Sequence, residues 1–358
     1  MANAAMAGAP PLHCGIPEEI AIWEILVRLP PKALLRCRAV CRAWRRATST
    51  RDFLLAHHAH QPSLPLVYDD SLYTMTYRAG LVPADQSQFV ARLGSVDLPW
   101  LASCDGLLVI FVRGEHFFVR NPATRQSANL PLLHGFRPLG MYRHSPTGEY
   151  RLLLYRSRRW MYGPLPPDVQ EGSYVFAIGS GQPPRHIGWH DAEKLICTAG
   201  PVMFGGRLHW YTCHVIMIFD NTTESFRQMR SPFVPGHAQL FEMDNMLGMS
   251  VLNDEGKSVD IWVVQDYEGG DWALKYRVEL PAVEIRVQFG MSEIKYWHVR
   301  VVSCDGDVLV LLKFDDWLLQ VDINGELVAG FHHRDLILTQ VRLKQSLVLH
   351  TFFPTLEG

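Results

Sequence analysis

The sequence predicts an α+β chain of two domains. A small N-terminal module of three helices is expected over residues 16–60, and an all-β, propeller-like domain of about six blades over residues 64–354. Three observations favour this fold. Apolar residues recur at helical spacing before residue 61, short strand-like runs separated by turn residues follow, and some of these runs repeat. Residues 1–15 are expected to form a flexible tail.

The overall composition excludes several classes of protein. The chain has 358 residues, 48% of them apolar, which is enough for two domains. A formal net charge of −2 predicts no general affinity for nucleic acid or for an anionic membrane. Seven irregularly spaced cysteines are typical of reduced thiols inside a cell. No apolar run suits a signal peptide or a membrane span, so we expect a cytoplasmic or nuclear protein.

Two helical stripes and one cap define the N-terminal module. The first predicted helix places four apolar residues on one face: Ile22, Ile25, Leu26 and Leu29. The second places four more at similar spacing: Leu34, Cys37, Cys41 and Trp44. Pro30-Pro31 separates the two, and a third helix is expected to begin after Ser49 or Thr50. So short a module buries too little apolar surface to be stable alone, so we expect it to bind a partner.

Beyond Pro65 the chain is expected to form short antiparallel strands. The predicted strands are Leu107–Val112, Phe117–Arg120, Arg151–Tyr155, Tyr174–Ile178, Val215–Phe219, Val259–Val264, Val308–Phe314 and Trp317–Val321. Turn residues such as Gly205-Gly206 and Asn324-Gly325 separate them. Near-absence of helical periodicity excludes a βαβ fold and leaves a sandwich, a barrel or a propeller.

Internal repetition favours the propeller. Ser-Cys-Asp-Gly occurs at 103–106 and again at 303–306, each time leading into two strands and a turn. A looser copy begins at Phe204, and the interval from Gly206 to Asn221 equals that from Gly106 to Asn121. Gly-led antiparallel units in series are typical of propeller blades. The last strand candidates, Leu336–Thr339 and Ser346–Phe352, could pair with the early strand near Leu64–Tyr68.

The helical module closely resembles an F-box. The match spans Ile16–Ile20, Glu24–Pro30 and Leu34–Trp44, so that many spaced positions agree at once. The remainder resembles the F-box-associated, Kelch-related propeller domains common in plant F-box proteins, with residues 121–126 and 177–182 typical of that group.

This resemblance implies a role in ubiquitin ligation without catalysis. In the family, the module docks onto a Skp-family adaptor and through it onto a cullin, and the propeller captures a target protein. The matching adaptor-binding positions are Ile16, Pro17, Ile20, Leu26, Leu29, Pro30, Leu34, Leu35, Val40, Cys41 and Trp44. An apolar helical stripe with an aromatic residue suits a helix-in-groove interface. The implied function is the substrate-recognition subunit of a Skp–cullin–F-box ligase, with no cofactor, metal or catalytic residue.

One spacing departs from the commonest F-box pattern. The segment between Pro17 and Glu24 is one residue longer, and an extra residue turns a helical face by roughly 100°. We expect either a loop that absorbs it, or shifted contacts for Ile16 and Pro17.

Other chemistry finds little support in the sequence. The module carries many basic residues, but no helix-turn-helix spacing supports nucleic-acid binding. Cys37 and Cys41 precede His57, His58 and His60 at zinc-like spacing, yet both cysteines lie on an apolar stripe. Cys104 and Cys304 occupy equivalent repeat positions, which argues against a nucleophile. Four histidines are scattered without a metal-binding motif: His186, His190, His209 and His214.

Several alternatives remain open at this stage. The chain could be an F-box scaffold without a degradation role, or its propeller could bind a glycan or another small ligand. An oxidase-type enzyme is a further alternative. A long loop from Arg156 to Pro167 is a candidate partner-binding segment.

Overall fold

The chain divides into two compact units. The computed structural model describes residues 16–71, 74–79, 88–94, 100–112, 116–157, 170–188, 193–196, 200–212, 215–232, 238–253, 256–289, 298–304, 307–314, 316–332 and 336–354. The helical unit comprises residues up to 61 together with 346–349, and the propeller unit comprises residues 62–345 with 350–358. The predicted tail of residues 1–15 lies outside the described residues.

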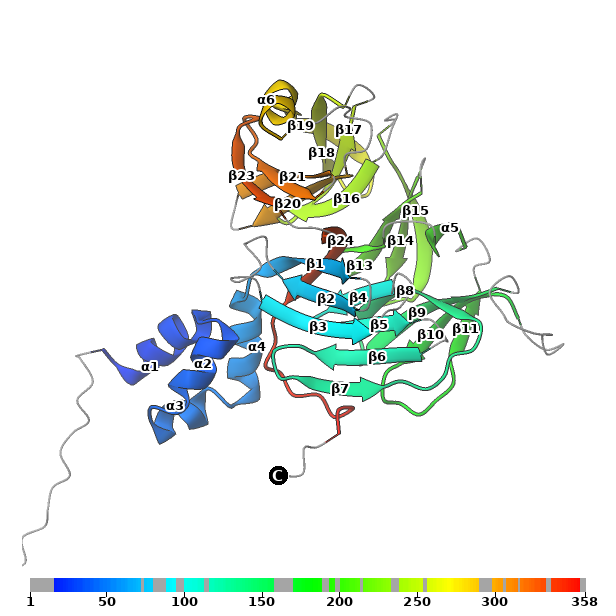
Figure 1. Cartoon of the computed structure of the whole chain (residues 1–358). Helices are drawn as coiled ribbons and strands as arrows, with labels where there is room; N and C mark the ends of the chain where they lie inside the picture. Colours follow the sequence, from blue (N-terminus) through cyan, green and yellow to red (C-terminus); the bar gives the residue numbers. More distant parts are fainter. Residues whose placement is uncertain are drawn as a thin grey trace, which may run out of the picture. The chain divides into compact units, whose positions relative to one another are not determined.

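The helical unit consists of short helices. The first run contains α1 (Glu18–Ile20), the π-helical turn η1 (Ala21–Ile25) and the 3-10 turn η2 (Leu26–Arg28). It is followed by α2 (Pro31–Cys37), α3 (Arg42–Ala47) and α4 (Arg51–His60) (Figure 1). Pro31 opens α2 and Thr50 caps α4, where its hydroxyl accepts from the Phe53 amide; both were predicted.

The stripe predicted as one helix from Leu34 to Trp44 is in fact two helices. Residues 38–40 form a turn, and Cys41 is extended with φ −151° and ψ 158°. The Cys41 thiol accepts a hydrogen bond from the Trp44 amide, 3.4 Å away, and so caps α3. Cys41 therefore acts as a helix cap, which its spacing alone does not reveal.

The propeller unit contains six four-stranded antiparallel sheets in its described part. Sheet A has the order β24 (Leu336–Lys344), β1 (Ser63–Ser71), β2 (Thr74–Ala79) and β3 (Gln88–Gly94). Sheet B contains β4 (Trp100–Cys104), β5 (Leu107–Val112), β6 (His116–Asn121) and β7 (Gln126–Asn129). Sheet C contains β8 (Phe136–Arg143), β9 (Tyr150–Arg156), β10 (Gly172–Ala177) and β11 (Arg185–Gly188).

The other three sheets continue the same up-and-down pattern. Sheet D contains β12 (Val202–Phe204), β13 (Arg207–Tyr211), β14 (Val215–Asp220) and β15 (Ser225–Arg230). Sheet E contains β16 (Ala238–Met243), β17 (Met246–Leu252), β18 (Ser258–Asp266) and β19 (Asp271–Glu279). Sheet F contains β20 (His298–Cys304), β21 (Asp307–Phe314), β22 (Trp317–Val321) and β23 (Leu327–His332), and two short helices, α5 (Glu193–Ile196) and α6 (Ala282–Phe289), lie between strands. All eight predicted strands are present, and the predicted fold class is confirmed.

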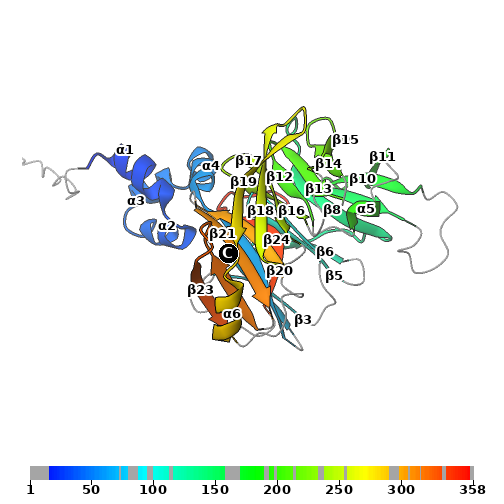
Figure 2. The same ribbon diagram turned by 90° about the horizontal axis from the view of Figure 1, so that it is seen from above.

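An apolar cluster fills the space between each pair of neighbouring sheets. The cluster between sheets A and B includes Leu66 and Ile110, and the one between A and F includes Val67 and Leu311. Four further clusters join B to C, C to D, D to E and E to F. The six clusters therefore connect the sheets in a closed cycle. Figures 1 and 2 show the sheets from two directions at right angles.

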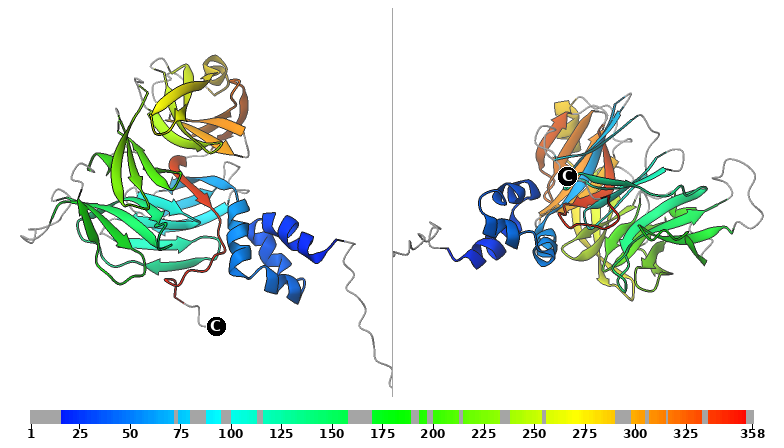
Figure 3. Two further views of the ribbon diagram at one scale, coloured as in Figure 1. Left: turned by 180° about the vertical axis from the view of Figure 1, so that it is seen from behind. Right: turned by 90° about the horizontal axis from the view of Figure 1, so that it is seen from below.

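The chain ends meet in sheet A. β24 pairs antiparallel with β1, with Val67 opposite Leu338 and Leu64 opposite Leu343. Figure 3 shows the red C-terminal strand beside the blue β1. The predicted pairing of Leu336–Thr339 is thus confirmed. The second candidate, Ser346–Phe352, is not a strand: residues 345–350 have no regular structure, and the buried Ser346, Leu347 and Val348 belong to the helical unit.

The repeated sequence marks the tight turn between the first two strands of a sheet. Asp105 and Gly106 both have positive φ (49° and 84°), as do Gly205 and Gly206 (55° and 71°), which suits a two-residue hairpin. The second turn differs from the prediction, because Asn121 is equivalent to Asp220 rather than to Asn221. Asn121 and Asp220 each accept two backbone N–H bonds in that turn.

We expect Gly325→Ala to destabilise the propeller strongly. Gly325 has φ +85°, and an added Cβ would clash with the carbonyl oxygen of Glu279. Left-handed strain and the clash together should lower the free energy of unfolding by roughly 2–5 kcal/mol. Gly181→Ala is the matched control: its φ is +67° but nothing lies within 4 Å, so only about 1–2 kcal/mol should be lost. Chemical denaturation measures both, and equal losses would contradict the role of the Glu279 contact.

Candidate functional site

The predicted adaptor-binding residues divide into a buried group and an exposed group. Leu26 and Leu34 lie in the core of the helical unit, with 3% and 0% of their surface accessible. Leu29, Cys41 and Trp44 are half-buried, and Pro17 and Pro30 are exposed. Four predicted residues are exposed apolar side chains: Ile16, Ile20, Leu35 and Val40. The buried members hold the fold, and the exposed ones are available to a partner.

The first helical run exposes two further large apolar residues that the prediction missed. Trp23 and Ile25 leave 43% and 46% of their surface accessible. The Trp23 ring also packs on Phe53, with the ring centroids 5.6 Å apart, so its position is fixed by the core. We define the exposed apolar set as Ile16, Ile20, Trp23, Ile25, Leu35 and Val40. Several large apolar side chains left exposed on so small a unit are typical of a protein-binding module.

The π-helical turn explains both the misplaced Ile25 and the extra residue in the sequence. In η1 the Leu26 amide bonds to the carbonyls of Ala21 and Ile22, so the turn holds one residue more than an α-helical turn. The ideal helical pattern placed Ile25 on the buried face with Ile22 and Leu26. The wider turn instead buries Ile22 and Leu26 and leaves Ile25 exposed. The chain absorbs its extra residue inside the helix, whereas a preceding loop or shifted contacts were predicted.

We expect deletion of Ala21 to be well tolerated. Removing one residue from the π-helical turn should restore regular α-helical bonding while the flanking residues keep their faces. The thermal unfolding midpoint of the full chain should change by no more than a few degrees. Insertion of one alanine after Leu34 is the control, because it turns the face of α2 by roughly 100° and should destabilise the unit. Strong destabilisation by the Ala21 deletion would contradict the proposed role of η1.

The helical unit is strongly basic. Between residues 16 and 61 it has eight arginine and lysine side chains against four aspartate and glutamate side chains. Arg38 is committed to the fold, because its guanidinium donates to the carbonyl and the hydroxyl of Thr48, and burial lowers its pKa. Arg28 pairs with Glu24 at 2.9 Å, with both side chains exposed. The other basic side chains of the unit are also exposed: Lys32, Arg36, Arg42, Arg45, Arg46 and Arg51. They favour a partner with an acidic surface.

Cys41 and His57 of the helical unit have structural partners. Cys41 caps α3, and the buried His57 bonds through Nε2 to the Leu29 carbonyl at 2.8 Å. Burial lowers the pKa of His57, which suits a neutral core histidine. Within the described ranges, no three histidine, cysteine or acidic side chains are grouped as a metal site would need.

The residues considered for catalysis in the propeller are placed as follows. Cys104 lies beside Asp105, and burial raises the pKa of its thiol well above the usual range, which opposes a nucleophilic role. His186 packs edge-on against Tyr174. The side chain of Cys304, His190, His214 and the loop segment 158–167 lie outside the described residues.

His209 forms a buried polar pair with Tyr267. Its Nδ1 lies 3.1 Å from the Arg207 carbonyl, so Nδ1 carries the proton and Nε2 accepts from the Tyr267 hydroxyl at 2.6 Å. The guanidinium groups of Arg207 and Arg227 lie over the Tyr267 ring, 5.6 and 5.1 Å from its centroid. Burial, with smaller contributions from both arginine charges, lowers the pKa of His209 to about 4. The pair links β13 to the turn after β18 and is structural.

We expect the propeller to lose stability in mild acid through His209. The folded-state pKa lies below the unfolded value of 6.5, so the unfolded chain binds the proton more readily. The stability that neutral His209 contributes to the folded state is fully present above pH 6.5 and is lost as the pH falls toward 4. It amounts to about 3 kcal/mol at most. Urea unfolding of the wild type and of His209→Gln between pH 7.5 and 4 tests this, and an unchanged pH slope in the variant would contradict it.

None of the helices in the described part of the chain has the length and apolar character needed to cross a bilayer.

Comparison with known proteins gives the same division of the chain. The family described as "F-box associated beta propeller domain" matches residues 81–315, and the family described as "F-box-like" matches residues 14–59. A putative F-box/kelch-repeat protein of Arabidopsis thaliana is 23% identical, over 94% of this chain and 90% of its own length. A putative F-box protein of the same plant is 24% identical, over 77% of this chain and 76% of its own length.

Proposed function

Because this chain belongs to the family of F-box proteins that carry an F-box-associated β-propeller domain, we propose that it is the substrate-recognition subunit of a Skp–cullin–F-box ubiquitin ligase. The helical unit would bind a Skp-family adaptor, and the propeller would bind a target protein. The proposed place of action is the cytoplasm, the nucleus or both.

One observation carries the adaptor-binding part of this proposal. The helical unit uses Leu26, Leu34 and Phe53 to fill its own core, yet it leaves the six side chains of the exposed apolar set accessible. A partner that covered them would stabilise the complex by about 25 cal/mol for each Å² of apolar surface removed from water. The exposed cations of the same unit favour an acidic partner. A surface of this composition supports docking onto another protein.

The proposed mechanism requires no bond chemistry within this chain. A receptor that holds both the ligase and the target raises the effective concentration of target lysines near the activated ubiquitin. The propeller suits that task, since six sheets joined by apolar clusters provide a platform for the loops that connect their strands.

The adaptor-binding proposal is tested by charge substitutions at exposed positions. We expect Leu35→Asp combined with Val40→Asp to weaken binding to a co-expressed Skp-family adaptor by at least about 30-fold, which corresponds to 2 kcal/mol. Both side chains are exposed, Val40 at 65%, so the fold should persist. Size-exclusion chromatography and calorimetry of the full chain measure the affinity, and circular dichroism checks the fold.

Two controls make this test specific. Leu132→Asp changes a propeller residue with similar exposure and should leave adaptor binding intact. Leu34→Asp is unsuitable for the interface, because that side chain is fully buried and a charge there should unfold the helical unit. A folded wild type that does not bind the adaptor, or a double variant that binds normally, would overturn the proposal. Adaptor binding without any target stabilised on depletion of this protein would favour a scaffold.

A further inference from the structure

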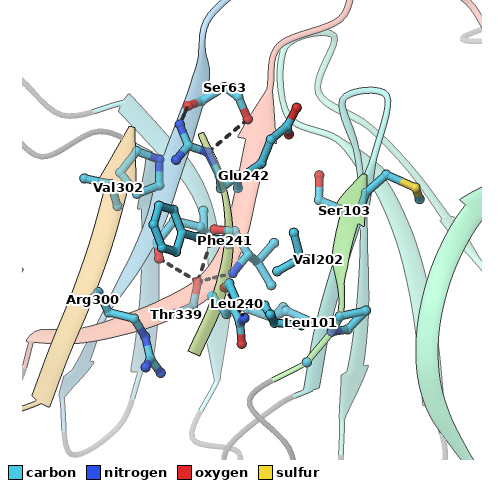
Figure 4. A pocket seen from close by; sticks show the side chains of 18 of the residues that line it. Ser63, Leu101, Ser103, Val202, Leu240, Phe241, Glu242, Arg300, Val302 and Thr339 are labelled. Atoms are coloured by element: carbon cyan, nitrogen blue, oxygen red, sulfur yellow. Dashed lines mark hydrogen bonds between the residues drawn. The ribbon is translucent and has the colours of Figure 1, made fainter. Parts of the chain in front are cut away.

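All six sheets of the propeller border one central cavity. Its volume is about 210 Å³. The lining residues come from β1 and β24 of sheet A, β4 of sheet B, β8 of sheet C, β12 of sheet D, β16 of sheet E and β20 of sheet F. Most of the wall is apolar, including Leu101, Val202 and Leu240, which Figure 4 shows facing the same space. The cavity therefore lies where the propeller closes.

Several polar side chains in the wall are used to close the ring. The Thr339 hydroxyl donates to the Leu66 carbonyl at 2.6 Å. Arg342 donates to the carbonyls of Ser63 and Ser303, the latter at 2.7 Å. These bonds tie β24 to sheet A and to sheet F. Thr339 and Arg342 thus have a structural role that needs no ligand.

Two other polar side chains of the wall retain unused hydrogen-bonding capacity. The Gln340 amide donates through Nε2 to the Leu240 carbonyl at 2.9 Å. A carbonyl can only accept, so this bond fixes the orientation of the amide and leaves Oε1 as the unpaired atom. The Nε of Arg300 is likewise buried, and neither atom has a hydrogen-bond partner among the described residues.

The Arg300 guanidinium also lacks a compensating charge. Burial lowers its pKa, and no carboxylate in the described part of the chain counters this effect. Glu242 also lines the cavity, but Figure 4 shows it at the opposite end from Arg300. Arg300 is half-buried, and a partly desolvated cation without a partner is costly to a fold. The wall therefore has an unused donor on Arg300 and an unused acceptor on Gln340. A ligand that fits must supply an acceptor for the first and a donor for the second.

We propose that the central cavity binds a small organic acid that carries a hydroxyl or amino group. The ligand carboxylate accepts hydrogen bonds from Arg300, and the hydroxyl or amino group donates to Gln340 Oε1. The apolar wall contacts the short carbon skeleton. This site is independent of adaptor docking.

Size and charge select this class of ligand. Drug-sized sites occupy about 300–1,000 Å³, so a cavity of about 210 Å³ restricts the ligand to a small molecule. A planar guanidinium matches a carboxylate with two parallel hydrogen bonds. The other charged side chains of the wall balance in formal charge, with Arg342 and Lys344 against Glu242 and Asp105, so a ligand with a single negative charge compensates Arg300.

The test uses the full-length chain and defined probes. Glycolate, lactate and alanine are titrated at millimolar concentration, and binding is followed by thermal shift and saturation-transfer NMR. We expect at least one of them to raise the unfolding temperature and to show transfer. Lactamide, which lacks the carboxylate, should bind at least about tenfold more weakly than lactate. Inorganic phosphate should give no protection.

Substitutions locate the site. Arg300→Met keeps an unbranched side chain but removes the unpaired guanidinium, so the ligand-free protein should be at least as stable as the wild type while its response to the acids is lost. Arg277→Met is the matched control, because Arg277 is exposed and pairs with Asp260 on the outer strands of sheet E. The proposal is overturned if folded wild type binds none of the three acids, if Arg300→Met binds them normally, or if lactamide or phosphate binds as well as lactate.

Discussion

The propeller depends on hydrogen bonds between β1 and β24, two strands from opposite ends of the chain. Thr339 donates to the carbonyl of Leu66 across a separation of 273 residues. Without that pairing, sheet A would lack its first strand, and the apolar clusters it shares with sheets B and F would lose Leu343 and Leu336. Joining residues so distant in sequence carries a large entropic cost. The six inter-sheet clusters offset that cost together, which makes the ring cooperative.

The polar side chains of β24 serve two purposes. Some close the ring of sheets, and one is available to the proposed ligand. The side chains of Thr339 and Arg342 donate hydrogen bonds to neighbouring backbone carbonyls. The amide oxygen of Gln340, which lies between them in sequence, accepts none from the described residues. The register between β1 and β24 shifts between Pro65 and Val67, opposite this stretch, so these side chains do not follow regular alternation and one strand can serve both purposes. The centre of the ring is therefore the place where stability and a ligand site compete for the same few residues.

The helical unit shows an analogous division. Leu34 and Leu35 are neighbours in sequence, yet one is fully buried and the other is exposed. The buried residues fix the positions of the exposed ones, as Phe53 does for Trp23. The unit also includes residues 346–349, so its core draws on both ends of the chain. Such tertiary contacts, rather than helix propensity, stabilise the short helices of this module.

Elements whose causes are local could be predicted from the amino-acid sequence. All eight predicted strands, the start of α2 at Pro31, the cap at Thr50 and the turn at Asp105-Gly106 follow from alternation, capping and turn chemistry acting over a few residues. Only the tertiary structure decided the faces of the first helix, because an ideal period of 3.6 residues cannot anticipate the π-helical turn that exposes Ile25. The split between α2 and α3, the irregular course of Ser346–Phe352 and the meeting of Arg300 with Gln340 in one cavity were likewise decided by packing. Contacts between residues far apart in the chain leave no local periodicity for a sequence to display.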